Sequence, residues 1–330
     1  MKKILALVLA IAMLATFAAC GGAKEAEYKL GMGISVSLDS SKDETAQCDA
    51  TVATVVLDAE GKIVAADLDC AQTKVKSSDV EDLSKVDVRT KKEKKEDYNM
   101  KGASPIGKEW YEQAAAFVEK MVGKTVADIE AIETKEENGH NVAVDADLYA
   151  ACTMDITAFK AAFVAACKDA QAKTFTAAAD SFKLGLDVET KVDGSKAEEA
   201  QLYSTFGAIV VDADGKTLAA IVDEIQPKVT FDEDGVVADK KYTDTKRNLK
   251  EDYNMVKFSP EGTCIAEWYV QAASLTDYIA EKGMTADEIA AIATADTRND
   301  GYMRPTDADL AAVCTMQISG YQTVLANAAK

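Results

Sequence analysis

The side chains best suited to hold a flat, polar small molecule occur twice in this sequence, in the same order. Trp110-Tyr111 returns as Trp268-Tyr269, and Gln72-Thr73-Lys74 returns as Gln226-Pro227-Lys228. An aromatic ring offers a flat face with a polar edge, and a lysine ammonium can neutralise a phosphate. Each pair therefore indicates either a ligand site or a feature that the fold needs twice. The second interpretation makes the tryptophans core residues and the lysines charges on edge strands.

Two further repeated blocks carry polar groups. Glu96-Asp97-Tyr98-Asn99-Met100 returns unchanged as Glu251-Asp252-Tyr253-Asn254-Met255. Tyr98 and Tyr253 could form the rim of a ligand site or belong to a turn that both copies need. An Asp and a Thr six residues apart also recur, as Asp147 with Thr153 and Asp309 with Thr315. The two aspartates could orient a ligand, although Thr306-Asp307-Ala308-Asp309 also has the spacing of a capping box.

These blocks belong to one long repeat, because the segment from Tyr28 is repeated from Phe182 to the C-terminus. Matching residues lie 154 to 162 positions apart, whereas solenoid repeats are about 20–50 residues long. The sequence therefore predicts two tandem homologous domains, 28–172 and 182–330, joined by a linker over 173–181. With 48% hydrophobic residues, each domain can bury a core.

The first 27 residues are predicted to be a leader and a tether. Met1-Lys2-Lys3 precedes an apolar run over 4–17, which is typical of a secretory signal peptide. Phe17-Ala18-Ala19-Cys20 is similar to a bacterial lipobox. We expect a lipoprotein signal peptide over 1–20, lipidation at Cys20 and a short tether over 21–27. The protein would then be anchored by lipid at the extracytoplasmic face of the cell membrane.

Composition disfavours several classes of function. The formal net charge of −19 argues against nucleic-acid binding, which requires clustered Lys and Arg. The single histidine, His140, and the lack of a Cys-x-x-Cys pair argue against a zinc site and a Ser-His-Asp triad, and we expect no metal site. Hydrolase or transferase activity ranks below binding, because no repeated carboxylate pair stands out.

Six cysteines follow Cys20. Cys48 and Cys70 flank the predicted turn at Gly61 and would lie nearly opposite each other in a hairpin, where a disulfide could form. Leu202 and Glu224 occupy the equivalent positions, so the fold does not require that bond. Cys152 and Cys314 share one repeat position, and we expect both to be small buried hydrophobic residues.

Each copy begins with β-rich sequence. Runs over 50–57 and 63–68 flank Gly61, and runs over 206–211 and 217–222 flank Gly215, which predicts one hairpin per copy. A further turn at Gly235 predicts another hairpin in the second copy.

Helices follow in each copy. They are expected to begin at Ser104-Pro105 and Ser259-Pro260 and, with capping boxes, at Thr125 and Thr285. Alternation over 152–157 and 314–319 predicts strands with Thr153 and Thr315 opposite the apolar face, followed in the first copy by an Ala-rich helix to about residue 172. The fold class is α+β, with each domain a mainly antiparallel sheet and helices packed to one side.

This order of elements resembles the FMN-binding domain family, which includes extracytoplasmic flavin subunits of Rnf-type and sodium-pumping oxidoreductases and flavinylated Gram-positive lipoproteins. The family motif Asp-x-x-Ser/Thr-Gly-Ala-Thr/Ser presents a hydroxyl that is esterified to the FMN phosphate. The segments 147–153 and 309–315 keep the acid and the final Thr, but Ala151 and Val313 replace the glycine. Because glycine permits a close backbone approach, the resemblance implies noncovalent rather than covalent FMN here.

Three functions remain open on the sequence. The first is an electron carrier or flavin binder that receives electrons from a membrane redox donor. The cofactor-binding residues would then be Gln72, Gln226, Lys74, Lys228, Tyr98, Tyr253, Trp110, Trp268, Asp147, Asp309, Thr153 and Thr315. The second is a non-redox surface protein that binds a small molecule or glycan, and the third is a structural surface lipoprotein.

Overall fold

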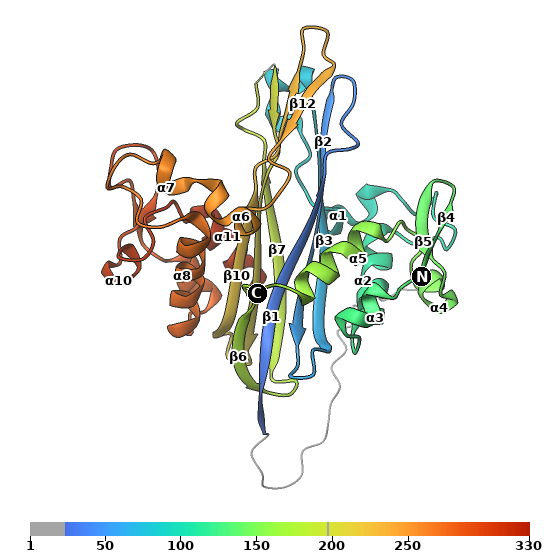
Figure 1. Ribbon diagram of the computed structural model, residues 1–330, viewed down its shortest axis with the longest axis horizontal. Helices are drawn as coiled ribbons and strands as arrows, with labels where there is room; N and C mark the ends of the chain where they lie inside the picture. Colours follow the sequence, from blue (N-terminus) through green and yellow to red (C-terminus); the bar gives the residue numbers. More distant parts are fainter. Residues whose placement is uncertain (1–23, 197) are drawn as a thin grey trace, which may run out of the picture.

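The computed structural model describes residues 24–196 and 198–330. The predicted signal peptide and the lipidation site Cys20 lie outside these residues. The structure is 31% helical and 34% strand, with several antiparallel sheets, so the expected mixture of helices and antiparallel sheets is confirmed. Strands form the elongated centre of the molecule and helices lie on both sides of them (Figure 1).

A four-stranded antiparallel sheet forms the centre of the first half, 28–172, and extends a few residues beyond each end of that range. Its strands are β1 (Glu25–Ser37), β2 (Thr45–Leu57), β3 (Ile63–Lys76) and β6 (Lys173–Ala178), in the order β3-β2-β1-β6. In the register, Gly33 faces Ala53, and Glu25 faces Ala178. The predicted linker over 173–181 therefore supplies an edge strand, and the end of the predicted tether belongs to β1.

Two smaller sheets form the strand layer of the second half, 182–330. One consists of β7 (Phe182–Lys191), β9 (Tyr203–Asp212) and β10 (Thr217–Ile225), in the order β10-β9-β7. The other consists of β8 (Glu199–Gln201), β11 (Lys228–Phe231) and β12 (Val237–Lys241), in the order β12-β11-β8.

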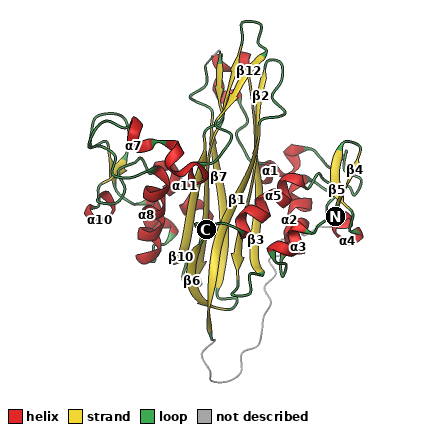
Figure 2. Ribbon diagram, in the orientation of Figure 1, coloured by secondary structure: helices red, strands yellow, loops and turns green. Residues whose placement is uncertain are grey.

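Short helices connect these strands on the outer sides (Figure 2). The first half carries α1 (Lys91–Lys94), α2 (Trp110–Met121), α3 (Val126–Glu130), α4 (Ala146–Ala151), α5 (Thr157–Cys167) and the hairpin of β4 (Thr134–Glu137) and β5 (His140–Ala143). The second half carries α6 (Lys246–Leu249), α7 (Met255–Phe258), α8 (Trp268–Glu281), α9 (Ala286–Ala290), α10 (Ala308–Ala311), α11 (Ser319–Ala328) and the short pair β13 (Thr294–Ala295) and β14 (Arg304–Pro305). Within the described ranges, no helix is both long and apolar enough to cross a membrane.

The hydrophobic core has three parts. The largest cluster lies between the strand layers and takes residues from both halves, such as Leu30 and Val52 from the first and Phe206 and Val210 from the second. The other two clusters lie between each strand layer and its own helices. The molecule is thus layered helix, sheet, sheet, helix, and the two halves share their central core.

Glycines bring helices α5 and α11 close to the strands. A Cβ atom at Gly31 or Gly33 would collide with the backbone of α5, and one at Gly185 would collide with Ala328 at the end of α11. Because only glycine lacks that atom, these positions set how closely each helix packs against its sheet.

Several predicted elements are confirmed. The hairpins β2–β3 and β9–β10 turn at Gly61 and Gly215, which have positive φ values of 75° and 76°. The further hairpin, β11–β12, turns at Gly235. The capping boxes at Thr125 and Thr285 begin α3 and α9, and Cys152 and Cys314 are buried.

The helices expected at the Ser-Pro pairs begin later, which corrects that prediction. α2 begins at Trp110 and α8 at Trp268. Each Ser-Pro pair lies in a turn instead, and the chain then passes through Gly107 or Gly262 at positive φ. A residue in that conformation interrupts a right-handed helix, so the helix can begin only after it.

The strands expected at Thr153 and Thr315 are loops, and α5 ends at Cys167 rather than near 172. In each loop, the amide oxygen of a buried glutamine accepts the hydrogen bond from the threonine N–H. A side chain therefore replaces the neighbouring strand that the alternating pattern implied.

The disulfide considered for Cys48 and Cys70 is not formed, and both residues are free thiols. In the register, Cys48 faces Thr73 and Cys70 faces Thr51. Cys48 belongs to the core between the sheets, whereas Cys70 belongs to the core beneath the first-half helices. The two side chains point to opposite faces of one sheet because their strand positions differ in parity.

Candidate ligand cleft in the second half

A cleft of about 750 Å³ opens on the helical side of the second half. This volume is within the range of small-molecule sites. Strands β9 and β10, helix α6, the chain from Tyr253 to Trp268 and the loop before α11 line it. Four residues singled out by the repeat lie together in its lining, namely Gln226, Tyr253, Trp268 and Thr315.

The floor of the cleft contains a buried ion pair between Lys246 and Glu224. Their side chains are only 6% and 5% exposed. The ammonium of Lys246 donates to the hydroxyl of Tyr203 over 3.0 Å, and Glu224 accepts a 2.6 Å hydrogen bond from the hydroxyl of Tyr321. Each buried charge thus has a charged partner and a phenol, as buried charges require.

Aromatic rings surround this ammonium group. The Nζ atom of Lys246 lies 5.3 Å from the ring centre of Tyr203, 4.7 Å from that of Tyr253 and 5.6 Å from that of Trp268. The indole N–H of Trp268 donates to Tyr321 over 2.9 Å. Because a cation is attracted to the face of an aromatic ring, Lys246 holds these rings in position around the floor.

Burial and charge shift the pKa values of this network. Burial by itself lowers the pKa of Lys246, but the charges of Glu224 and the nearby phenols outweigh it and raise that pKa. Burial, followed by the charge of Glu224, raises the pKa of Tyr321 well above its ordinary value. At neutral pH the lysine is therefore a fixed cation and Tyr321 a neutral hydrogen-bond donor.

The repeated Gln-Tyr pair makes the same contact in both halves. The Tyr253 hydroxyl donates to Gln226 over 3.3 Å, and the Tyr98 hydroxyl donates to Gln72 over 3.4 Å. Gln226 also donates to Tyr203 at the cleft floor, whereas Gln72 donates to Asp49 over 2.6 Å. The identical Glu-Asp-Tyr-Asn-Met blocks form a turn that delivers this tyrosine, and in the second half the tyrosine also lines the cleft.

Each block is fixed to the next helix by a glutamate. Glu109 accepts hydrogen bonds from the backbone of Met100 and Lys101, and Glu267 accepts from that of Met255 and Val256. Asn99 and Asn254 end the turns at φ values of 57° and 56°. Left-handed conformation is tolerated by Asn, which explains why it recurs at this position.

Thr153 and Thr315 both bind a buried glutamine. The backbone N–H and hydroxyl of Thr315 donate to Oε1 of Gln271 over 2.7 and 3.1 Å, and those of Thr153 donate to Gln113 over 2.9 and 3.1 Å. Gln113 and Gln271 are fully buried. The hydroxyl of each threonine is thus already used as a donor within the fold.

The other predicted site residues lie elsewhere. Trp110 is buried against Phe159, Lys74 is exposed on edge strand β3, and Lys228 pairs with Glu199 over 3.0 Å. Asp147 lines a separate surface hollow beside Lys120 and Lys124.

The acids Asp147 and Asp309 are exposed, and neither begins its helix. Asp145 and Asp307 cap α4 and α10 instead. The capping-box pattern from Thr306 was therefore offset by one residue from the true cap.

Sequence reasoning missed Lys246 and the rim of the cleft. Thr245-Lys246 matches Thr90-Lys91 at the same offset as the Tyr-Asn-Met blocks, so extending the identical block upstream would have found this lysine. Lys91 likewise lies over the rings of Tyr98 and Trp110. The rim residues Phe258, Arg298, Tyr302 and Arg304 carry no repeat signal, because they lie where the copies diverge.

The rim combines exposed rings with guanidinium groups. Phe258 is 77% and Tyr302 is 55% exposed, and Arg304 lies 5.5 Å from the ring centre of Tyr302. Arg304 is held by Asp300 over 2.7 Å and by the carbonyl oxygen of Thr315 over 3.0 Å. Arg298 donates to the carbonyl oxygen of Thr263 over 2.6 Å. Arg304 is buried, so it fixes the Tyr302 ring rather than contacting a ligand. The exposed rings can stack on a planar ligand, and the exposed Arg298 can meet a polar or anionic group.

The residues that the structure describes include no cluster of three or more side chains arranged to hold a metal ion. Comparison of the chain with protein-family models, curated proteins and solved structures found no match.

Proposed function

We propose that this protein binds a planar small molecule in the second-half cleft, at the extracytoplasmic face of the membrane, and that noncovalent FMN is the first candidate ligand. The observation that carries the proposal is that Gln226, Tyr253, Trp268 and Thr315 line one cleft together with exposed rings. Lipid anchoring through Cys20, and the two homologous domains, are part of the same proposal and rest on the sequence.

The chemistry of the cleft fits such a ligand. Phe258 and Tyr302 offer flat apolar faces at the rim. Two cations of the lining, Arg298 and Lys191, can bind an anionic group of the ligand. Bound FMN would supply electron transfer, and the residues of this chain would bind and orient it. The hydroxyl of Thr315 is engaged with Gln271, which favours noncovalent over ester-linked flavin.

Tyr302→Ala is the variant that tests this proposal. We expect it to weaken FMN binding roughly three- to tenfold, the usual value of one lost stacking face. The matched control is Tyr242→Ala, since Tyr242 is 56% exposed and Tyr302 is 55% exposed, but Tyr242 does not line the cleft. Binding would be measured by titration of the purified mature chain, with riboflavin as a second ligand.

Wild-type protein that takes up neither flavin would exclude the flavin proposal. Equal affinities of the Tyr302 and Tyr242 variants would instead place flavin outside this cleft. A non-redox binder of another ring-bearing molecule or glycan is favoured by Asp193, an exposed acid in the same lining. A ligand that raises the melting temperature of wild type but not of the Tyr302 variant would identify that class.

A further inference from the structure

The floor of the cleft is held in place by the other half of the chain. Lys246 and Arg247 are consecutive residues of the four-residue helix α6, and their side chains are only 6% and 8% exposed. The side chain of Lys246 contacts Glu224 in the cleft. The side chain of Arg247 instead reaches the first half and pairs with Asp169.

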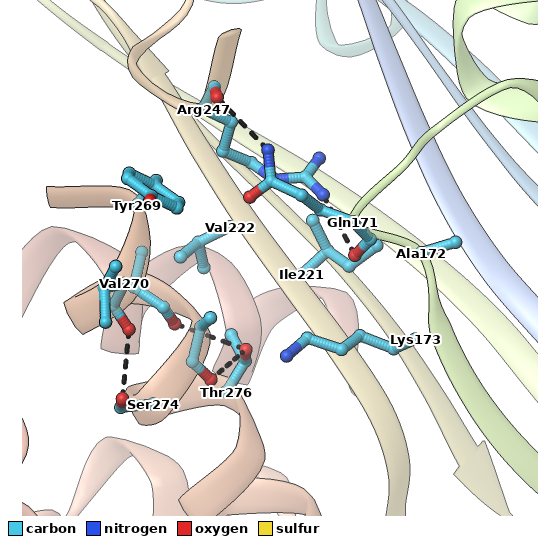
Figure 3. Close-up of a pocket in the computed structure, with 12 residues that line it drawn as sticks. Gln171, Ala172, Lys173, Ile221, Val222, Arg247, Tyr269, Val270, Ser274 and Thr276 are labelled. Carbon is cyan, nitrogen blue, oxygen red and sulfur yellow. Dashed lines mark hydrogen bonds between the residues drawn. The ribbon is translucent and has the colours of Figure 1, made fainter. Parts of the chain in front are cut away.

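The contact between Arg247 and the first half has several parts. One guanidinium nitrogen of Arg247 donates to both carboxylate oxygens of Asp169, over 3.1 and 3.0 Å, and to the carbonyl oxygen of Gln171 over 3.2 Å. In return, the side-chain amide of Gln171 donates to the carbonyl oxygen of Arg247 over 3.1 Å. Figure 3 shows Arg247 and Gln171 joined by hydrogen bonds near the α8 residues Tyr269 and Val270. Both the side chain and the backbone of Arg247 are therefore fixed by the first half.

Asp169 is itself held firmly. Its carboxylate accepts hydrogen bonds from the backbone N–H groups of Met32 on β1 and of Gln171. On the other side, the backbone N–H of Arg247 donates to the buried Asp223 over 3.1 Å. Strand β1 of the first half and strand β10 of the second are thus connected through α6, which carries the cleft lysine.

The first half has no equivalent of this contact. Lys92 follows Lys91 as Arg247 follows Lys246, but Lys92 is exposed and pairs with Asp67. A buried ion pair adds little net stability compared with a well-packed apolar substitute, and its better-attested role is to fix one arrangement. The asymmetry therefore indicates that α6 must be held in one arrangement in the second half, whereas α1 in the first half need not be.

We propose that Arg247 is a positioning residue for the second-half cleft, so that the first half is a working part of the ligand site. This inference rests on the proposed function for the ligand affinity it predicts. If Arg247 is lost, α6 loses its attachment to the first half. Lys246 then no longer holds the rings of Tyr203, Tyr253 and Trp268 in their positions around its ammonium group.

The test uses the full mature chain with Trp110→Phe. The protein has two tryptophans, so in this background all tryptophan fluorescence comes from Trp268. In Arg247→Met, we expect Trp268 emission to shift to longer wavelength and its quenching by acrylamide to rise. FMN affinity should fall about tenfold. Lys92→Met is the matched control and should change neither signal. Arg247→Lys, which keeps the charge, should bring both the Trp268 fluorescence and the FMN affinity most of the way back to their wild-type values.

Asp169→Asn provides a second variant if Arg247→Met does not fold, since the amide oxygen can still accept from Met32. It should shift Trp268 emission in the same direction. A folded Arg247→Met or Asp169→Asn protein with wild-type Trp268 emission and quenching would overturn the proposal. If wild-type protein binds no flavin, the proposed function fails, while the tryptophan signal still decides the role of Arg247.

Discussion

Two buried aspartates occupy the same place in the two halves. Asp223 accepts hydrogen bonds from the backbone of Glu224 and Arg247 over 2.7 and 3.1 Å, and Asp69 accepts from that of Cys70 and Lys92 over 2.6 and 3.1 Å. Burial, only partly opposed by nearby positive charge and these bonds, raises the pKa of each carboxyl to about 6. Each aspartate thus joins the start of a short helix to a strand, at the cost of a buried charge at neutral pH.

Because the folded pKa of Asp223 is higher than its unfolded value of about 3.9, the folded protein binds this proton more tightly. This group therefore favours folding at low pH, and its contribution is lost as pH rises from about 4 to about 6. Asp223→Asn keeps an accepting oxygen and removes the titration. As pH rises across that range, we expect the free energy of unfolding of the variant, minus that of wild type, to increase by up to about 3 kcal/mol.

Urea unfolding at several pH values would measure this difference. Asp69→Asn should behave alike, whereas Asp239→Asn should not, because nearby Lys241 lowers the pKa of that exposed carboxyl. Parallel stability curves for wild type and Asp223→Asn between pH 4 and 6 would show that the carboxyl does not titrate there.

The sequence could identify some residues of the cleft and not others. Trp268, Tyr253, Gln226 and Thr315 were found because both copies keep them. Glu224 and Tyr321 were not, because Cys70 and Phe159 replace them in the first copy. A comparison of repeats detects what the copies share, so the polar groups that distinguish the second-half floor gave no signal.

The loops that carry Thr153 and Thr315 depend on a glutamine from a different helix. Gln271 lies on α8, and its amide group joins the Thr315 loop to the carbonyl oxygen of Ala266. Gln271→Leu would leave the half-buried N–H of Thr315 without its acceptor, which costs about 1–3 kcal/mol. Thr315→Ala keeps that N–H bond and should cost less than about 1 kcal/mol.

Chemical denaturation of both variants would measure these costs, with Gln113→Leu and Thr153→Ala as the matched pair in the first half. FMN binding should survive in Thr315→Ala. A flavin adduct in the intact mass of wild type that disappears in this variant would instead show that Thr315 is an attachment site.

Elements set by local chemistry were predictable from the sequence. The glycine turns and the capping boxes of Thr125 and Thr285 depend on residues within a few positions of one another. The start of α8 was not predictable, because the carboxylate of Glu267 binds backbone groups 11 and 12 residues earlier. Likewise, the period-two pattern around Thr315 was misleading because its hydrogen-bond partner lies 44 residues away.

The packing of one sheet on the other could not be read from the repeat. Residues 50–57 of β2 are all buried, which indicates that both faces of the strand are covered. One face contacts the helices of its own half and the other contacts the second half. The apolar run predicts burial, but it does not say which segment of the chain provides the cover.

A shared core predicts that the two halves unfold together. Val52→Ala, at a fully buried position between the sheets, should lower the midpoint of a single transition. Trp110 and Trp268 lie in the first and second halves, so Trp268→Phe and Trp110→Phe backgrounds allow each half to be followed separately. Coincident urea curves from the two backgrounds are expected. Separate midpoints, or a shift in only one curve, would show that the halves are independent.

The central core also explains why the two halves are carried on one chain. A single half in solution would expose the apolar face of its sheet and would need a second molecule to cover it. With β6 running directly into β7 through 179–181, the covering partner is always present, and association no longer depends on protein concentration. The two halves thus relate to each other as the subunits of a dimer would, but with the partner held at a fixed high local concentration by the chain itself.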